Sequence, residues 1–221
     1  MFFPLSWVEG VETLIQTIIV PRHQMKIQGE SVTRCIVVTQ GGLAPVGIMI
    51  AARNRSSAVS KLVLTSPPQY EDLTQPIAQP EIERNYNFLR SNVLGKIAFD
   101  FLETRVAVRF FSNLFLFSSK DCDNEWLDLA TNGKQCSEEA RTPVQAINSG
   151  MLSHRSFEEE LKDLKQPTLI LSGQTDKREV NAHVFKKEMR QCVILTIEGK
   201  NVLPWENPRG VSIAIKSFID N

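Results

Sequence analysis

Apolar residues near the N-terminus recur at the spacing of an amphipathic helix. Ser6 and Glu9 have the spacing of a capping box, and the apolar positions that follow continue until Pro21. Because proline has no amide hydrogen and clashes with the preceding turn, we expect the helix to end there. A polar turn is expected around Gln28–Glu30. The apolar positions are Val8, Val11, Leu14, Ile15, Ile18 and Ile19.

Four short runs of aliphatic and β-branched residues predict strands that are buried on both faces. Turn residues bound each run, and a helical pattern follows three of them. Strands that alternate with helices indicate βαβ units, so the sequence predicts an α/β fold with a parallel sheet. The runs are Cys35–Val38, Lys61–Thr65, Thr168–Leu171 and Val193–Ile197; the helical patterns are Leu43–Arg53, Val180–Met189 and Val211–Ile219.

The 101 residues between the second and third predicted strands, Pro67–Pro167, contain helical periods but no convincing strand. Because an unstructured loop of that length is improbable in a compact protein, we expect a helical insertion. Its Phe-rich stretch, Phe99–Phe117, is interrupted by charged residues, which argues against a membrane span. We expect these phenylalanines to form the core of the insertion; an apolar ligand chamber or a partner face is the alternative. The apolar stripes are Ile82, Tyr86 and Leu89; Val93, Ile97, Phe101 and Leu102; and Val106, Phe110, Leu114 and Phe117.

Charge and hydropathy narrow the possible functions. The 221 residues include 25 basic and 25 acidic side chains, so the net charge is zero and no basic surface drives binding to nucleic acid. The longest apolar stretch, Gly42–Ala52, is far shorter than the roughly 20 residues that span a bilayer. The N-terminus begins without a positive charge and carries Glu9 and Glu12, unlike a secretory signal. We expect a soluble intracellular or organellar protein.

The four cysteines are widely separated and form no C-x-x-C pair. This spacing indicates neither a zinc site nor a disulfide framework. We therefore expect reduced, mostly buried thiols, no metal and no cofactor. The cysteines are Cys35, Cys122, Cys136 and Cys192.

From about residue 32 to the C-terminus, the order of motifs resembles the α/β-hydrolase superfamily. The markers are an elbow-like turn, a following strand, a helical cap, an acid-bearing turn and a segment with an E-x-P ending. The resemblance implies a truncated α/β-hydrolase-like parallel sheet with a helical cap insertion, the core being residues 1–66 and 168–221 and the cap residues 67–167. The motifs, in order, are Val38–Ala44, Lys61–Pro68, Leu169–Asp176 and Ile197–Pro208.

The resemblance places the nucleophile, acid and base of the hydrolase triad at Gly41, Asp176 and Asn201. Glycine tolerates the strained turn of the elbow but supplies no nucleophile. Asparagine cannot accept and return a proton near neutral pH. Leu43 also stands where close helix–strand packing normally requires a small residue, which casts doubt on the detailed geometry of the turn. Asp176 is equally well explained as a helix N-cap or turn former.

Few other residues could restore a triad. Of the three histidines, His183 follows Asp176 most closely and is the rival base, whereas His23 and His154 lie away from the predicted strand ends. The hydroxyl of Thr39 belongs to the strand before the turn. Cys35 lies in an apolar run, where a thiol is expected to be inert.

Compared with the fold that the resemblance implies, the N-terminal part of this sequence is short. About 34 residues with one predicted helix precede Cys35, so the N-terminal strands and the loop that donates to the oxyanion hole are expected to be missing. The edge of the Cys35–Val38 strand then needs a cover. A partner protein, a longer form of the chain, or a fold-back of the N-terminal segment could supply it. Met1–Leu5 with Trp7 is either a docking segment or ordinary core.

These residues favour a catalytically inactive α/β-hydrolase-like protein that acts as a binding or structural subunit of a larger assembly. An alternative is an esterase- or lipase-like hydrolase with a non-standard catalytic set, such as Asp176 with His183. A third reading is a carrier that holds an apolar small molecule between the Phe-rich cap and the core. The substrate, ligand, partner and compartment cannot be derived from the sequence.

Overall fold

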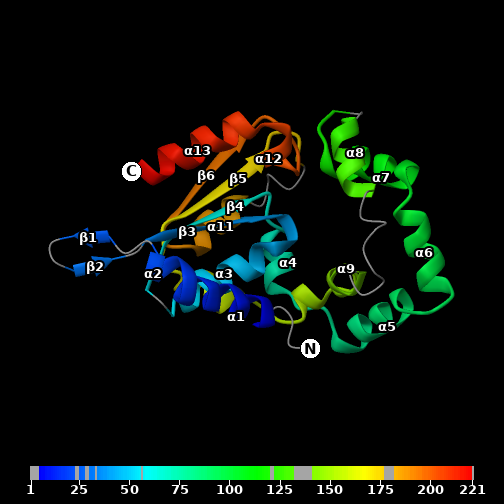
Figure 1. The fold of residues 1–221 in the computed structure, drawn as a ribbon, viewed down its shortest axis with the longest axis horizontal. Coiled ribbons are helices and arrows are strands. Elements are labelled where there is room, and N and C mark those ends of the chain that lie inside the picture. The colour runs from blue at the N-terminus through cyan, green and yellow to red at the C-terminus, as the bar shows by residue number, and fades with distance from the viewer. Residues whose placement is uncertain are drawn as a thin grey trace.

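A four-stranded parallel sheet lies at the centre of the fold (Figure 1). The computed structural model describes residues 5–22, 25–27, 30–32, 34–55, 57–119, 122–131, 141–176 and 182–220. The strand order is β3-β4-β5-β6, so both the fold class and the four predicted strands are confirmed. The strands are β3 (Cys35–Gln40), β4 (Val59–Thr65), β5 (Thr168–Gly173) and β6 (Cys192–Ile197).

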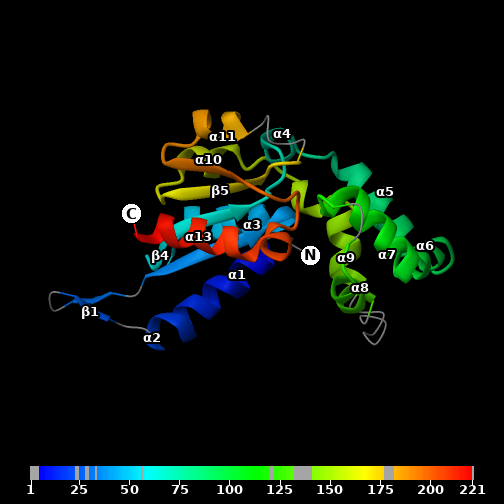
Figure 2. The ribbon, with the colours of Figure 1, turned by 90° about the horizontal axis from the view of Figure 1, so that it is seen from above.

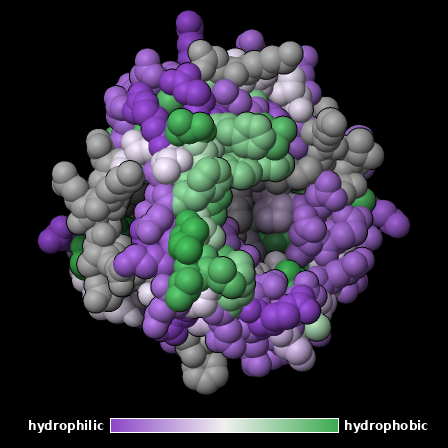
Figure 3. Space-filling view, turned by 90° about the vertical axis from the view of Figure 1, so that its right-hand side faces the viewer, coloured by the Kyte–Doolittle hydropathy of each residue, from purple (hydrophilic) through white to green (hydrophobic). Residues whose placement is uncertain are grey.

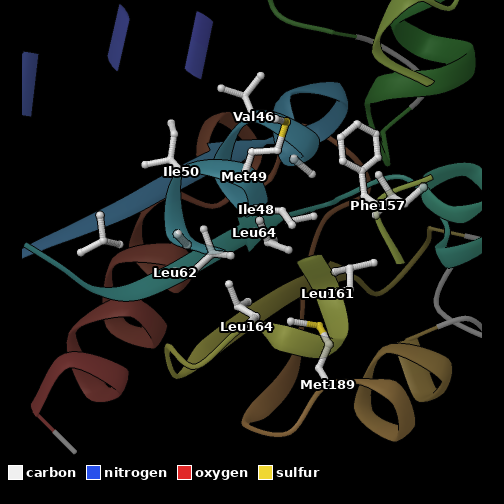
Figure 4. Packing of buried hydrophobic residues seen from close by; sticks show 14 of the residues in the cluster. Val46, Ile48, Met49, Ile50, Leu62, Leu64, Phe157, Leu161, Leu164 and Met189 are labelled. Carbon is white, nitrogen blue, oxygen red and sulfur yellow. The ribbon is translucent and has the colours of Figure 1, made fainter. Parts of the chain in front are cut away.

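Alternating residues of the central strands fill two separate cores. Leu62 and Leu64 of β4 are fully buried on one face together with Phe157, and Figure 4 shows this packing at close range. Val63, between them in the sequence, joins Leu169 on the opposite face. Because side chains alternate along a strand, a sheet buried on both faces needs such continuous apolar runs.

Helices cover both faces of the sheet. The first face carries α3 (Ala44–Arg53), with α10 and α11, and the second face carries α12 and α13. All three helical patterns predicted after strands form helices. The bounds are α10 (Glu158–Asp163), α11 (Ala182–Glu188), α12 (Leu203–Glu206) and α13 (Pro208–Asp220).

The N-terminal helix continues past the predicted stop at Pro21. It runs as α1 (Leu5–Leu14), a π-helical turn (Ile15–Ile19) and α2 (Val20–Arg22). In the π turn, Val20 donates to the carbonyl of Ile15, five residues back. This widening of the backbone gives the proline ring room that a regular α-helical turn does not offer.

The N-terminal helix packs on α3, not on the outer edge of β3. The buried carboxylate of Glu12 lies 3.1 Å from Nη2 of Arg53 on α3. Leu5 and Trp7 contact the main core, so their part of the predicted docking segment is ordinary packing; residues 1–4 lie outside the described residues. In the described part of the chain, no strand pairs with the free edge of β3.

A small hairpin separates the N-terminal helix from β3. Its strands, β1 (Met25–Ile27) and β2 (Glu30–Val32), pair antiparallel and form their own two-stranded sheet. Both views place the hairpin away from the central sheet (Figures 1 and 2). The sequence pattern predicted a turn here, but not the paired strands.

The insertion between β4 and β5 is helical, as predicted. Its middle helices pack on one another in sequence and extend to one side of the sheet (Figures 1 and 2). None of the described helices is long and apolar enough to cross a bilayer. The bounds are α4 (Tyr70–Thr74), α5 (Gln79–Leu89), α6 (Leu94–Leu102), α7 (Arg105–Phe111), a π turn (Ser112–Leu116), α8 (Asn124–Thr131) and α9 (Arg141–Asn148).

The prediction that the Phe-rich stretch forms the core of the insertion is wrong for most of its members. Phe99 and Phe117 are buried, but Phe101, Phe110 and Phe115 are more than half exposed. The helical periods are real, yet among the described residues one apolar stripe of α6 and α7 stays exposed. An apolar band crosses that end of the molecule (Figure 3).

Candidate functional site at the carboxyl edge of the sheet

The turn after β3 has the backbone of a sharp elbow. Gly41 has a φ of 55° and opens a short 3₁₀ turn, Gly41–Leu43, that leads into α3. A Cβ built on Gly41 meets nothing within 4 Å. Glycine adopts this left-handed backbone without steric cost, so the turn forms here without a side chain at its tip.

The close contact between helix and strand is at Gly47, not at the position of Leu43. A Cβ on Gly47 would lie 2.6 Å from Cγ2 of Thr39, whereas Leu43 is partly exposed. Leu43, whose position cast doubt on the detailed geometry of the turn, is 38% exposed. The Thr39 hydroxyl is buried without a hydrogen-bond partner and packs toward α3.

The loop after β6 returns to the end of β3. Nε2 of Gln40 donates a 2.7 Å hydrogen bond to the main-chain oxygen of Asn201. The amide nitrogen of Asn201 in turn donates to the carbonyl of Leu116, the last residue of the π turn in the insertion, at 3.0 Å. The main chain at Asn201 therefore joins the elbow strand to the insertion.

Glu206 fixes the same loop to the insertion. Its Oε2 accepts a 2.7 Å hydrogen bond from the Lys200 amide, and its Oε1 accepts from the amide and hydroxyl of Ser118, both at 2.6 Å. Nζ of Lys200 donates to the carbonyl of Leu114 at 2.7 Å. The E-x-P ending singled out in the sequence thus anchors the insertion.

Aromatic rings reinforce this anchor. Nε1 of Trp205 donates to Asp123 at 2.7 Å, and its ring lies edge-to-face with Trp126 at 5.4 Å between centroids. The hydrogen bonds from Trp126 and Trp205 lower the pKa of Asp123 because they stabilise the ionised carboxylate.

Asp176 lies in the turn after β5, at the same edge of the sheet. Its side chain is buried, and its amide donates to the carbonyl of Gly173 at 3.0 Å. The preceding Thr175 donates both its amide and its hydroxyl to the carbonyl of Gly199. Since the carboxyl ends of parallel strands share one edge, Gly41, Asp176 and Asn201 all lie there.

Three residues that the sequence reasoning missed complete this edge. The Thr65 hydroxyl donates to Oε1 of Gln40, which links β4 to β3. Ser66 is buried, has a φ of 44° and donates from its hydroxyl to the carbonyl of Lys200 at 3.4 Å. A polar residue at the end of a buried strand, or directly after it, is the only sequence signal for them, and it does not say what each side chain contacts.

A buried serine at positive φ is unusual, and such a residue acts as a nucleophile only where a base can take its proton. The hydroxyl of Ser66 meets a main-chain carbonyl, which orients it but cannot remove its proton. His154 contacts the carbonyl of Met151 in the insertion, and His183 is exposed on α11. His23 lies outside the described residues.

The described cysteines and acidic groups are further candidates for a chemical centre. Burial raises the pKa of Cys35 and raises that of Cys192 to about 11, so both thiols are protonated at neutral pH. In the described ranges, no three His, Cys, Asp or Glu side chains gather as metal ligands would. Cys136 lies outside those ranges.

Known structures identify the fold. The chain matches a bromoperoxidase from Bacillus anthracis with a TM-score of 0.69 at 13% identity, covering 100% of this chain and 75% of that one. It matches the enol-lactonase of Burkholderia xenovorans with a TM-score of 0.65 at 14% identity, covering 97% and 72%. A probable hydrolytic enzyme from Pseudomonas aeruginosa gives 0.66 at 15%, covering 95% and 67%. No protein-family model and no curated protein matches the sequence.

The protein therefore has an α/β-hydrolase-like fold, as the sequence motifs indicated. Its parallel sheet and helical insertion correspond to about 70% of such a neighbour. At these identities the likeness establishes the fold, while function must be argued from the residues at the site.

Proposed function

We propose that this protein is a non-catalytic α/β-hydrolase-like protein that serves as a binding or structural subunit. The observation that carries the proposal is the pair of residues at the elbow and at the base position. Gly41 has no side chain to attack a substrate, and the Asn201 amide has no proton-transfer capacity near neutral pH. Both positions nevertheless keep well-defined backbone geometry.

The contacts around Asn201 support a structural use of the former catalytic edge. Its carbonyl accepts from Gln40 and its amide donates to Leu116, so the loop links the sheet to the insertion. Glu206 and Trp205 add further bonds across the same junction. The two bonds of Asn201 are made by its main chain, so they hold the loop in place whatever its side chain does.

The edge of β3 supports a partner. β3 ends the described parallel sheet, and Val38 on it is 52% exposed. Native proteins rarely leave the edge of a parallel sheet open, because unpaired amides and carbonyls recruit other chains. We propose that a strand from a partner, or from a longer form of the chain, covers this edge.

Short-chain aryl esters test the proposal directly. The pure protein is expected to show no turnover above that of an Asp176→Ala variant or of heat-denatured protein. Turnover that Asp176→Ala abolishes would establish an unrecognised catalytic set and overturn the proposal. A His183→Ala variant then tells whether that set is the Asp176–His183 pair named among the alternatives.

A reverse experiment probes the rest of the machinery. Gly41 has open space around it, so Gly41→Ser combined with Asn201→His places a nucleophile and a base without a clash at the elbow. We expect no esterase activity, because the donors of an oxyanion hole are proposed to be missing, and each donor contributes about 3 kcal/mol of transition-state stabilisation. Recovery of turnover in this variant alone would show that the N-terminal segment supplies those donors.

The carrier alternative receives less support. A cavity of about 440 Å³ lies in the insertion between α5, α6 and α9, but polar side chains such as Arg90, Asn92 and Gln145 dominate its described lining. The exposed phenylalanines point outward and do not enclose a chamber. Absence of binding of a fluorescent fatty acid, with hydrophobic dye binding measured in parallel, is the expected result.

A further inference from the structure

Two apolar stripes lie on the consecutive helices α6 and α7 at the outer end of the insertion, where an apolar band crosses the molecule (Figure 3). Val93, directly before α6, and Ile97 and Phe101 within it follow at intervals of four residues, the spacing of one helix face. Val106, Phe110 and Leu114 do the same along α7 and the π turn. We call these six residues the apolar strip. All are at least half exposed, and Val106 reaches 78%.

The strip is too large to be an incidental surface. Exposed fractions of 50–78% on side chains of this size amount to about 700 Å², and Phe111 and Phe115 adjoin it. The largest apolar patch of a typical monomer covers roughly 300–600 Å². A stable interface buries about 800 Å² on each partner. The area therefore matches one side of a dimer.

The chemistry of the strip fits an obligate contact between protein chains. It consists of aliphatic and aromatic side chains, the composition of homodimer interfaces. Phe110 lies edge-to-face with Phe111, and Phe111 stacks on Phe115, so part of the surface is ordered before any partner binds.

The ion-paired charges of the insertion argue against an anionic membrane as the occupant. Arg105 forms an ion pair with Asp128, and Arg141 pairs with both Asp100 and Glu103. These pairs leave those arginines little attraction for lipid headgroups, whereas surface helices that bind anionic bilayers carry a surplus of Lys and Arg. The whole chain also has zero net charge, so a second copy meets no net repulsion.

We infer that the apolar strip binds the same strip of a second copy of this chain around a two-fold axis. The i, i+4 stripes of α6 and α7 then pack against their counterparts as ridges into grooves, and form a four-helix layer. The inference does not depend on the proposed function, because the strip is formed by the insertion and not by the carboxyl edge of the sheet.

Sedimentation equilibrium at micromolar concentration tests the inference. We expect a mass of about 50 kDa, twice the 25.0 kDa of one chain. The variant Ile97→Asp with Phe110→Asp is expected to weaken self-association by at least about 100-fold, because it places four charges in the buried interface. Circular dichroism should be unchanged, since both side chains are already exposed. A milder variant, Ile97→Ser with Phe101→Ser, should also weaken self-association.

The matched control is Ile213→Asp on α13, which lies outside the insertion. Ile213 is about as exposed as Ile97, so this variant adds a comparable surface charge and should leave the dimer intact. A monomeric wild-type chain overturns the inference, as does a dimer that both strip variants leave unaffected. Flotation of a monomer with vesicles of phosphatidylcholine and phosphatidylserine, lost in the strip variants, would instead assign the strip to a bilayer surface. These readouts are independent of esterase activity and so separate this inference from the proposed function.

Discussion

The side-chain amide of Gln40 holds the main chain of Asn201, with 2.7 Å between Nε2 and the carbonyl oxygen. Gln40 ends β3 and Asn201 follows β6, so one hydrogen bond connects the ends of the two outer strands of the parallel sheet. The Thr65 hydroxyl bonds the other end of the same amide, which brings β4 into the link. Gln40, directly before the turn at Gly41, thus holds together the carboxyl edge of the parallel sheet.

Replacing Gln40 should weaken the fold measurably. Gln40→Leu removes both hydrogen bonds and takes the donor away from the Asn201 carbonyl, while the Thr65 hydroxyl keeps the Thr39 carbonyl as acceptor, so we expect a loss of about 1–2 kcal/mol in the free energy of unfolding. Urea denaturation measures it. The control Gln79→Leu removes an exposed side chain whose bond reaches only Glu83, one helical turn away, and should shift stability by less than about 0.5 kcal/mol. Equal effects would contradict the role given to Gln40.

Gly41 and Gly42 form a matched pair for testing backbone strain at the elbow. A Cβ at either position meets no atom within 4 Å, but only Gly41 has a positive φ. We therefore expect Gly41→Ala to destabilise the protein by about 1–2 kcal/mol and Gly42→Ala to have little or a slightly stabilising effect. Thermal unfolding of the two variants under identical conditions decides the matter. A neutral Gly41→Ala would show that the turn relaxes to another backbone conformation.

Gly173 is required for the close approach of two segments. A Cβ there would lie 2.0 Å from the carbonyl oxygen of Lys200, so Gly173→Ala must displace the loop that carries Asn201. We expect a loss of about 3 kcal/mol or more and faster tryptic cleavage after Lys200. The control Gly10→Ala, on an open face of α1, should stabilise by up to about 1 kcal/mol. Unchanged proteolysis at Lys200 would argue against this contact.

The pH dependence of Cys192 alkylation tests whether this thiol is buried in the sheet. Burial raises the pKa of Cys192 to about 11 from an ordinary value of 9.0, although Lys186 acts in the opposite direction. Alkylation of Cys192 by iodoacetamide should keep rising up to about pH 11, because the thiolate is the reacting form. The unfolded thiol ionises first, so this group reduces the stability of the fold progressively as pH rises above 9.0.

Mass spectrometry of the Cys192 peptide measures the alkylation rate, and circular dichroism at each pH confirms that the protein is folded. The same titration in urea should level off near the ordinary pKa of the thiol. A folded protein whose reaction levels off at that same pH would show that Cys192 is solvated.

The sheet was predictable because its signal is local. Runs such as Thr168–Leu171 are buried on both faces, so every residue contributes to the pattern, and the turns beside them are marked by Gly or Pro. The turn at Gly41 was predictable for the same reason, since glycine between a buried strand and a buried helix marks a position where the backbone adopts a positive φ without steric cost.

Other features depend on contacts that periodicity does not encode. The stripe of Ile97 and Phe101 is visible in the sequence, but not whether the rest of the chain covers it. The bonds of Gln40, Ser66 and Glu206 join segments distant in the sequence, so no local pattern announces them. The prediction that the N-terminal helix ends at Pro21 was wrong because the π turn before it cannot be read from residue types.

The position of the insertion also affects the order in which the chain assembles during synthesis. β3, α3 and β4 form a unit whose contacts are close in sequence. β4 can pair with β5 only after the 102 residues from 66 to 167 have been synthesised. At ribosomal speeds of roughly 5–20 residues per second, the inner edge of β4 stays unpaired for several seconds. Early chaperone contact with the nascent chain is expected at β4, a strand that later lies inside the sheet between β3 and β5.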